Sequence, residues 1–259
     1  KEYSAVYIAT GAHKSQALDI SGENLAGVMH GVIFMKDTNL GILKSVPEKV
    51  SVIGGGFTAI DCARSSLRLG AKEVSIVYRR TLEEMPAGEI EVSMHYLTSP
   101  VRITGGHDRK VAHLECIKNK LGEPDNKGRR RPIPTEGSNF IIPSDMIIAA
   151  IGQSPDIGFL SERFGIKINH WGMPVIEPES FMTSKNGVFA GGDCVTGPRN
   201  IIEVVADGRK AARSIHKFLA GEEIKGYKFY YKEQSPSERM PNYESVPRQS
   251  QDALSMKER

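Results

Sequence analysis

The alternation of apolar and polar positions near the middle of the first half of the chain predicts a strand, a helix and a second strand. After a glycine-rich stretch that ends at Pro47 and predicts a loop with a brief helix, residues 49–53 form a β-prone apolar run. Small and apolar residues then recur at helical spacing over residues 57–69, and Gly70 occupies the expected helix end. Residues 74–78 predict the second strand. This order is typical of a βαβ unit with parallel strands and a right-handed crossover.

Further apolar runs predict additional strands and one long helix. Residues 5–9 and 145–151 each predict a buried strand, and residues 187–190 predict a strand that ends at a glycine pair. Short β-prone runs between polar loops predict antiparallel strands over residues 101–142. The spacing over residues 201–219 predicts a helix whose inward face carries Val205, Gly208, Ala212, Ile215 and Leu219.

Composition excludes several classes of protein and partner. The 259 residues include 39% hydrophobic and 25% charged residues, which is typical of a globular protein. The net charge of +3 is too small to indicate a nucleic-acid or anionic-membrane partner. No apolar run approaches the ~20 residues that span a bilayer, so we expect no membrane insertion. Residues from 232 onward are polar and aperiodic, and they predict an extended tail.

The cysteines and histidines predict neither a disulfide framework nor a metal site. Cys62, Cys116 and Cys194 are widely spaced, which favours a reducing, cytoplasmic setting. Cys62 falls on the inward face of the first helix and is expected to be inert, whereas Cys194 is either an inert or a reactive thiol. The seven histidines lack ligand spacing. Residues 129–131, an arginine run among polar residues, predict a solvated hairpin tip.

A glycine-rich turn between the first predicted strand and helix is a candidate phosphate site. It contains Gly54-Gly55-Gly56-Phe57-Thr58-Ala59, which fits the pattern G-x-G-x-x-A. The first glycine permits a tight turn, the second lets a pyrophosphate approach the backbone, and the third small residue allows close helix–strand packing. The free N–H groups of the helix start then face the phosphates. The alternative is a glycine turn that serves packing alone.

Two arginines at the end of the second strand indicate which dinucleotide the turn would bind. An NAD site tends to place a carboxylate there, whereas an NADP site tends to place arginine near the 2′-phosphate. Here Arg79 and Arg80 occupy the position, and their planar, permanently charged groups suit a phosphate dianion. The residues therefore favour NADPH. The alternative is a pair of solvated arginines at a strand end.

A second strand–turn–helix junction contains Gly192 and Asp193. A carboxylate directly after a strand can accept hydrogen bonds from a polyol, although a cap or turn role is the commoner use of such an aspartate. Thr10 and Gly11, which follow the predicted strand at 5–9, are a weaker signal of the same kind.

Five segments in this order resemble the pyridine nucleotide-disulfide oxidoreductase superfamily, over about residues 1–220. The segments are residues 7–11, 52–63, 78–80 with 85–87, 150–156 and 188–193. The most similar branch is the NADPH-dependent glutamate synthase small-chain group, which includes flavin subunits of related electron-transferring complexes. Position 57 departs from that branch, because it holds Phe where Asn is common.

The resemblance implies roles for the candidate residues. Gly55, Gly56, Phe57 and Thr58 would hold the NADPH pyrophosphate, and Arg79 and Arg80 would bind the 2′-phosphate. Gly152 would lie near the nicotinamide, Thr10 and Gly11 would line FAD, and Asp193 of the Gly192-Asp193 turn would meet its ribityl-phosphate region. The helix from Ile201 would point at the flavin ring. No catalytic acid, base or metal ligand is expected, because the chemistry belongs to the cofactors.

The resemblance also implies an α/β fold, in which a Rossmann-like NAD(P)-binding domain with an antiparallel β-meander is inserted into a partial FAD-binding domain. The expected division is residues 1–43 as a remnant of the FAD-binding domain and crossover, 44–152 as the NADPH-binding domain, 153–225 as the C-terminal part of the FAD-binding domain, and 226–259 as the tail. The family's first FAD-binding glycine motif and its cysteine-bound iron–sulfur clusters have no counterpart in these residues. We therefore expect a fragment with an incomplete FAD site.

The implied activity is NADPH-dependent flavin reduction followed by electron transfer to a partner. That partner would be an iron–sulfur domain or an acceptor subunit, such as a glutaminase-type large subunit. The paired cysteines of disulfide reductases are absent from the sequence, so disulfide reduction is not expected. Two alternatives stay open: the flavin subunit of another NAD(P)H-oxidising complex, and a non-catalytic nucleotide-binding module.

Overall fold

The structure, a computed structural model, describes residues 3–86, 92–106, 108–125, 128, 130–160 and 164–225. The described residues belong to one compact unit, which extends to Lys225. The expected tail and Arg129 of the arginine run lie outside the described residues. Within the described part of the chain, no helix combines the length and apolarity that a membrane span requires.

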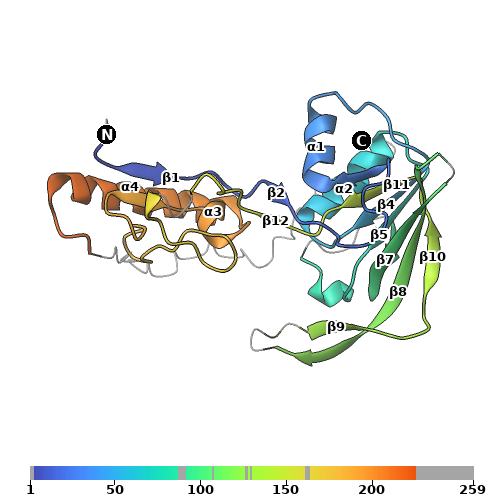
Figure 1. Ribbon diagram of the computed structural model, residues 1–259. Helices are drawn as coiled ribbons and strands as arrows, with labels where there is room; N and C mark the ends of the chain where they lie inside the picture. Colours follow the sequence, from blue (N-terminus) through green and yellow to red (C-terminus); the bar gives the residue numbers. More distant parts are fainter. Residues whose placement is uncertain are drawn as a thin grey trace, which may run out of the picture. The chain divides into compact units, whose positions relative to one another are not determined.

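A five-stranded parallel sheet carries the predicted βαβ unit (Figure 1). Its strands, in spatial order, are β3 (Val28–His30), β11 (Met146–Ala149), β4 (Lys49–Ile53), β5 (Glu73–Val77) and β6 (Ser93–His95). Helix α2 (Phe57–Arg68) connects β4 to β5, which lie parallel, and Gly70 follows the helix with a φ of +100°. The chain places β5 on one side of β4 and β11 on the other, so the strand order reverses beside β4.

Both faces of this sheet are covered by other elements. Successive side chains along a strand point to opposite faces, so neighbouring residues of β5 show what packs on each face. Ile76 is buried on the face that packs against α1 (Gly31–Asn39) and α2. Val77, the next residue, is buried on the opposite face, where Leu114 of the antiparallel sheet packs against it. The layered α/β fold expected from the sequence is confirmed.

The second layer is an antiparallel sheet, as residues 101–142 predicted. Its strands are β7 (Thr98–Gly105), β8 (Val111–Pro124), β9 (Arg130–Pro134) and β10 (Phe140–Pro143). β8 pairs with all three others, and its segment from Asn119 to Pro124 forms a hairpin with β9 (Figure 1). Arg130 and Arg131 therefore lie on a strand, and the solvated-tip prediction is wrong for Arg130, which makes ion pairs with Glu83 and Glu84.

The remaining strands pair the first 15 residues with segments that follow residue 150. β1 (Val6–Ile8) lies parallel to β13 (Val188–Ala190), and β2 (Lys14–Ser15) lies antiparallel to β12 (Gln153–Ser154). The strand expected at residues 5–9 forms, but the prediction that it is buried is wrong for Val6, which is 47% exposed, while Ile8 is buried. Val6 and Ile8 point to the same face of this two-stranded sheet, and of the two only Ile8 packs into the buried cluster that contains Ala190.

Helix α4 (Ile201–Ala220) forms where it was predicted, but it buries a different face. The helix follows the short helix α3 (Asp193–Thr196) and buries Asp207, Ala211 and Ser214. The predicted inward residues Val205 and Leu219 are 63% and 56% exposed, so that assignment is wrong. Helical periodicity identifies the element, but the buried face is the one that carries small side chains and an aspartate paired with Arg199. The proposed domain boundaries stay a prediction.

Candidate functional site

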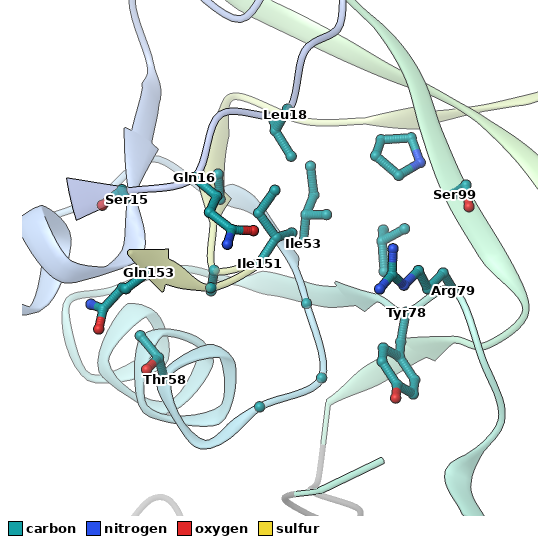
Figure 2. Close-up of a pocket in the computed structure, with 18 of the residues that line it drawn as sticks. Ser15, Gln16, Leu18, Ile53, Thr58, Tyr78, Arg79, Ser99, Ile151 and Gln153 are labelled. Carbon is teal, nitrogen blue, oxygen red and sulfur yellow. The ribbon is translucent and has the colours of Figure 1, made fainter. Parts of the chain in front are cut away.

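A cleft of about 540 Å³ opens at the carboxyl ends of the central parallel strands. The last residues of β4 and β11, Ile53 and Ala149, line it, as does Val77 of β5. Ligands of open parallel sheets bind at this end, where the strand order reverses. Figure 2 shows Gln16, Thr58 and Gln153 on one side of the cleft and Tyr78, Arg79 and Ser99 on the other.

The cleft brings together most of the residues predicted for the dinucleotide. Its lining includes Gly54, Gly55, Gly56, Thr58, Arg79, Arg80 and Gly152. Phe57 is the exception, because it does not line the cleft and its side chain is 71% exposed. Any contribution of Phe57 to binding therefore comes from its backbone N–H at the start of α2.

The three glycines of the turn have different surroundings. Gly54 has a φ of +137°, and a Cβ there would lie 2.3 Å from the carbonyl oxygen of Ala150. A Cβ at Gly55 would lie 2.5 Å from the ring of Tyr78. A Cβ at Gly56 would meet nothing within 4 Å, since this position faces open space. Packing alone thus requires glycine at the first two positions, whereas the absence of a side chain at Gly56 leaves room for a ligand to approach the backbone.

The start of α2 adds hydrogen-bond donors to this open space. Gly56 is the N-cap residue, and no side chain caps the helix in the described structure. The first N–H groups of a helix lack intrahelical partners, and they carry the positive end of the helix dipole. Ala59 is fully buried beneath the turn, which lets the helix and sheet pack closely. This geometry fits a pyrophosphate.

Charge in the cleft has one sign. Arg79 and Arg80 are the only charged residues among the described residues that line it, and that lining includes no carboxylate. The exposed Arg79 guanidinium has no protein partner in the described part of the chain, while Arg80 donates from Nε to the carbonyl oxygen of Arg130 at 3.0 Å. Such paired guanidiniums suit a phosphate dianion, so the residues present fit NADPH.

The opposite side of the cleft contains residues that sequence reasoning missed. Gly152 has a φ of +126°, and its carbonyl oxygen accepts a hydrogen bond from Gln16 N–H at 3.1 Å. The side chains of Gln16 and Gln153 line the cleft beside it. Gln153 lies in a segment that carries the family resemblance, which is a usable signal. Gln16 reaches the cleft only through the pairing of β2 with β12, for which the sequence shows no signal.

The residues predicted for FAD lie outside this cleft. Thr10 is exposed, and Gly11 and Gly192 have φ values of +71° and +72°. Asp193 accepts a hydrogen bond on Oδ1 from Arg199 N–H at 3.2 Å, which is the turn role that the sequence left open. Only one oxygen takes part in that bond, so the carboxylate keeps acceptor capacity for a polyol hydroxyl.

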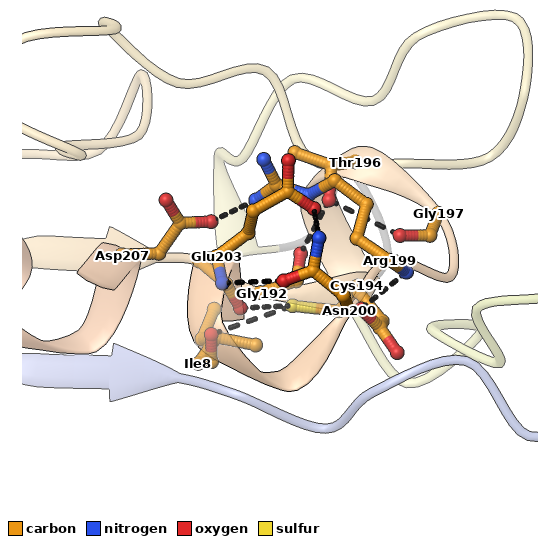
Figure 3. A network of polar contacts seen from close by, with 11 residues as sticks. Ile8, Gly192, Cys194, Thr196, Gly197, Arg199, Asn200, Glu203 and Asp207 are labelled. Atoms are coloured by element: carbon orange, nitrogen blue, oxygen red, sulfur yellow. Dashed lines mark hydrogen bonds and ion pairs between the residues drawn. The ribbon is translucent and has the colours of Figure 1, made fainter. Parts of the chain in front are cut away.

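The polar contacts around Asp193 extend along the start of α4 (Figure 3). Asn200 caps this helix by accepting from Glu203 N–H at 3.0 Å, and Arg199 pairs with Asp207. The α4 start is therefore capped by a side chain, in contrast to α2. Cys194 is fully buried, with Sγ 3.2 Å from the Gly191 carbonyl oxygen and 3.4 Å from that of Ile8. Of the two readings of Cys194, the inert thiol agrees with this burial.

The other two cysteines are also buried and unpaired. Burial raises the pKa of Cys62 to about 12, and it raises the pKa of Cys116 to about 12. Both thiols are therefore protonated at neutral pH, and thiolate chemistry is disfavoured. Among the described residues, no three His, Cys, Asp or Glu side chains form a cluster that could hold a metal ion.

Comparison with known proteins agrees with this geometry. The chain is 43% identical over 230 residues to the NADP(+)-dependent formate dehydrogenase subunit beta of Moorella thermoacetica, covering 85% of this chain and 32% of that protein. It is 33% identical over 241 residues to the glutamate synthase [NADPH] small chain of Escherichia coli, covering 84% of this chain and 51% of that protein. The chain thus spans about a third to a half of these curated relatives.

A solved structure shares the fold. FprA from Mycobacterium tuberculosis, in complex with NADPH, aligns with a TM-score of 0.67 at 21% identity, over 87% of this chain and 67% of FprA. The family model described as pyridine nucleotide-disulphide oxidoreductase matches residues 1–212. The chain therefore belongs to the pyridine nucleotide-disulphide oxidoreductase family.

Proposed function

We propose that this chain is the NADPH-binding part of a flavin-dependent oxidoreductase, in which a hydride passes from NADPH to FAD and electrons continue to an acceptor. The observation that carries the proposal is the cleft at the carboxyl ends of the parallel strands, where the described lining residues include two arginines and no carboxylate. The names of the Moorella and E. coli relatives, which refer to NADP(+) and NADPH, support this choice of coenzyme.

In this proposal the residues of the chain bind and orient the dinucleotide. The open face of Gly56 and the first N–H groups of α2, at Phe57 and Thr58, bind the pyrophosphate, while Gly54 and Gly55 maintain the turn. Arg79 and Arg80 bind the 2′-phosphate.

The nicotinamide end would lie at the other side of the cleft, where the Gly152 backbone is held by Gln16. Ile53 and Ile151 give this part of the cleft an apolar lining, which suits a planar ring. This side of the site therefore positions a ring, without supplying an acid or a base.

Thr10, Gly11, Gly192 and Asp193 would supply part of an FAD site. The left-handed backbone at both glycines and the spare acceptor capacity of Asp193 fit contact with a polyol and a phosphate. The rest of the flavin site belongs, in this proposal, to sequence outside these 259 residues.

The acceptor is either a glutaminase-type large subunit, as in glutamate synthases, or an iron–sulfur domain or subunit of another NADP-linked complex. The higher identity to the formate dehydrogenase subunit, 43% against 33%, favours the second class. A complex isolated through the full-length protein distinguishes them, because only the first partner would hydrolyse glutamine.

The proposal is tested by titrating the full-length protein that contains this chain with NADPH and NADH under anaerobic conditions. We expect flavin absorbance that bleaches at lower concentrations of NADPH than of NADH. Arg79→Asp should weaken NADPH roughly tenfold or more and leave NADH nearly unchanged, because a charge-assisted phosphate contact is lost. A colourless protein that binds NADPH without a redox change would be a non-catalytic module, and equal losses of both coenzymes would refute the 2′-phosphate role.

A further inference from the structure

Arg80 is held in the cleft by a hairpin whose described residues do not line the cleft. The acceptor for Arg80 Nε is the backbone carbonyl of Arg130, 50 positions further along the chain, at the start of β9. Arg130 is absent from the cleft lining. The position of the Arg80 guanidinium therefore depends on where the β8–β9 hairpin lies.

The hairpin is attached to the nucleotide-binding layer at the same residue. Arg130 Nε donates to Glu84 Oε1 at 2.9 Å, and a second guanidinium nitrogen lies 3.8 Å from Glu83 Oε2. Arg130 thus has two partners. Its side chain binds η1 (Leu82–Glu84), the 3₁₀ turn after β5, and its backbone carbonyl accepts from Arg80.

Glu84 is also held by hydrogen bonds to residues other than Arg130. Its Oε2 accepts from Thr81 Oγ1 at 2.6 Å and from Thr81 N–H at 3.0 Å, which closes a capping box around η1. Its backbone carbonyl accepts from the Tyr78 hydroxyl at 2.7 Å. The Thr81 hydroxyl is the main cause that lowers the pKa of Glu84 below its usual value, and Arg130 adds to it, so the carboxylate is ionised near neutral pH.

From this chain of contacts we infer that Glu84 and Arg130 are positioning residues for coenzyme selectivity. They would hold Arg80 where its remaining N–H groups meet the 2′-phosphate, although neither lines the cleft. The inference rests on the proposed function. A guanidinium that is already oriented loses less conformational entropy when it binds a phosphate, so loosening Arg80 weakens NADPH and leaves NADH unaffected.

The variant Glu84→Gln separates positioning from simple electrostatics by the sign of its effect. Removal of a negative charge near the cleft should strengthen binding of an anionic 2′-phosphate if Coulomb interactions alone matter. In Glu84, one carboxylate oxygen accepts from Thr81 and the other accepts from Arg130. Glutamine has only one terminal acceptor, the amide oxygen, because its amide nitrogen is a donor. It therefore cannot accept all of these hydrogen bonds. Positioning therefore predicts weaker NADPH binding.

The experiment measures KM or Kd for NADPH and NADH in the full-length protein. We expect Glu84→Gln and Arg130→Ala each to weaken NADPH about fivefold to tenfold, with NADH unchanged within about twofold. The double variant should lose no more than either single one, because both break the same chain of contacts. Arg131→Ala is the matched control, since it removes the same charge from the next, exposed position of β9 and should retain wild-type selectivity.

Three results would overturn the inference. Glu84→Gln that binds NADPH as tightly as wild type or more tightly would show that Arg80 needs no support. Equal losses of NADPH and NADH would assign the contacts to stability alone. A wild-type protein without preference for NADPH would refute the proposed function as well. If wild type prefers NADPH, and Arg80→Ala removes that preference while Glu84→Gln does not, only this inference fails.

Discussion

Substitution of Gly56 by alanine should separate the two uses of glycine in the turn after β4. The position has a φ of −89° and a ψ of 175°, which alanine adopts without strain, and an added Cβ would meet nothing within 4 Å. Stability should therefore change little. Reduced freedom of the unfolded chain favours alanine by about 0.4–1 kcal/mol, and the poorer N-cap preference of alanine offsets a similar amount.

The same methyl group should interfere with the ligand. It occupies the open space beside the first N–H groups of α2, where the pyrophosphate is proposed to lie. Loss of one or two charge-assisted hydrogen bonds, at about 1.5–3 kcal/mol each, corresponds to at least tenfold weaker NADPH binding. Because NADH carries the same pyrophosphate, its binding should weaken by a similar factor.

Gly54→Ala is the matched comparison. There the φ is +137° and the Cβ would lie 2.3 Å from the Ala150 carbonyl oxygen, so the backbone must move. We expect a loss of roughly 1–3 kcal/mol or more in the free energy of unfolding. Denaturant titration followed by circular dichroism, together with coenzyme titration, measures both effects. A Gly56→Ala protein that binds NADPH like wild type, or one that unfolds as easily as Gly54→Ala, would refute the reasoning.

Three further predictions concern stability and thiol reactivity. Ile76→Ala should lower the free energy of unfolding by about 2–5 kcal/mol in urea titrations, because Ile76 is fully buried in the sheet core; a loss below 1 kcal/mol would contradict that packing. Asn200→Ala should lower the free energy of unfolding by about 1 kcal/mol in the same titrations, because it removes the α4 cap. Asn200→Asp keeps the acceptor and should lower it much less. Cys62 and Cys116, whose pKa values are raised to about 12, should resist iodoacetamide at pH 8 until the protein unfolds, as mass spectrometry would show. Their ordinary pKa is 9.0, so above pH 9.0 the unfolded chain loses these protons more readily than the folded protein. The free energy of unfolding should therefore fall as the pH rises from 9.0 toward 12.

Local patterns in the sequence determined the elements of this protein and the class of its candidate site. The apolar run at residues 49–53, the helical spacing from Phe57 and the following strand predict the βαβ unit correctly, because buried strands and amphipathic helices have distinct hydrophobic periods. The glycines of the turn and the two arginines are adjacent in the chain to those elements. Their meeting in one cleft follows from the carboxyl ends of neighbouring parallel strands lying at the same edge of a sheet.

Only the tertiary structure decided which partners those residues have. Helical periodicity in α4 is compatible with several faces, and packing selected the face of Asp207 rather than that of Val205. Gln16 enters the cleft through a pairing between strands more than a hundred residues apart in sequence. Arg80 acquires its support from Arg130 in the same way, because a hairpin folds across the layer. Periodicity reports the local backbone, whereas contacts between distant segments depend on side-chain packing that no short pattern encodes.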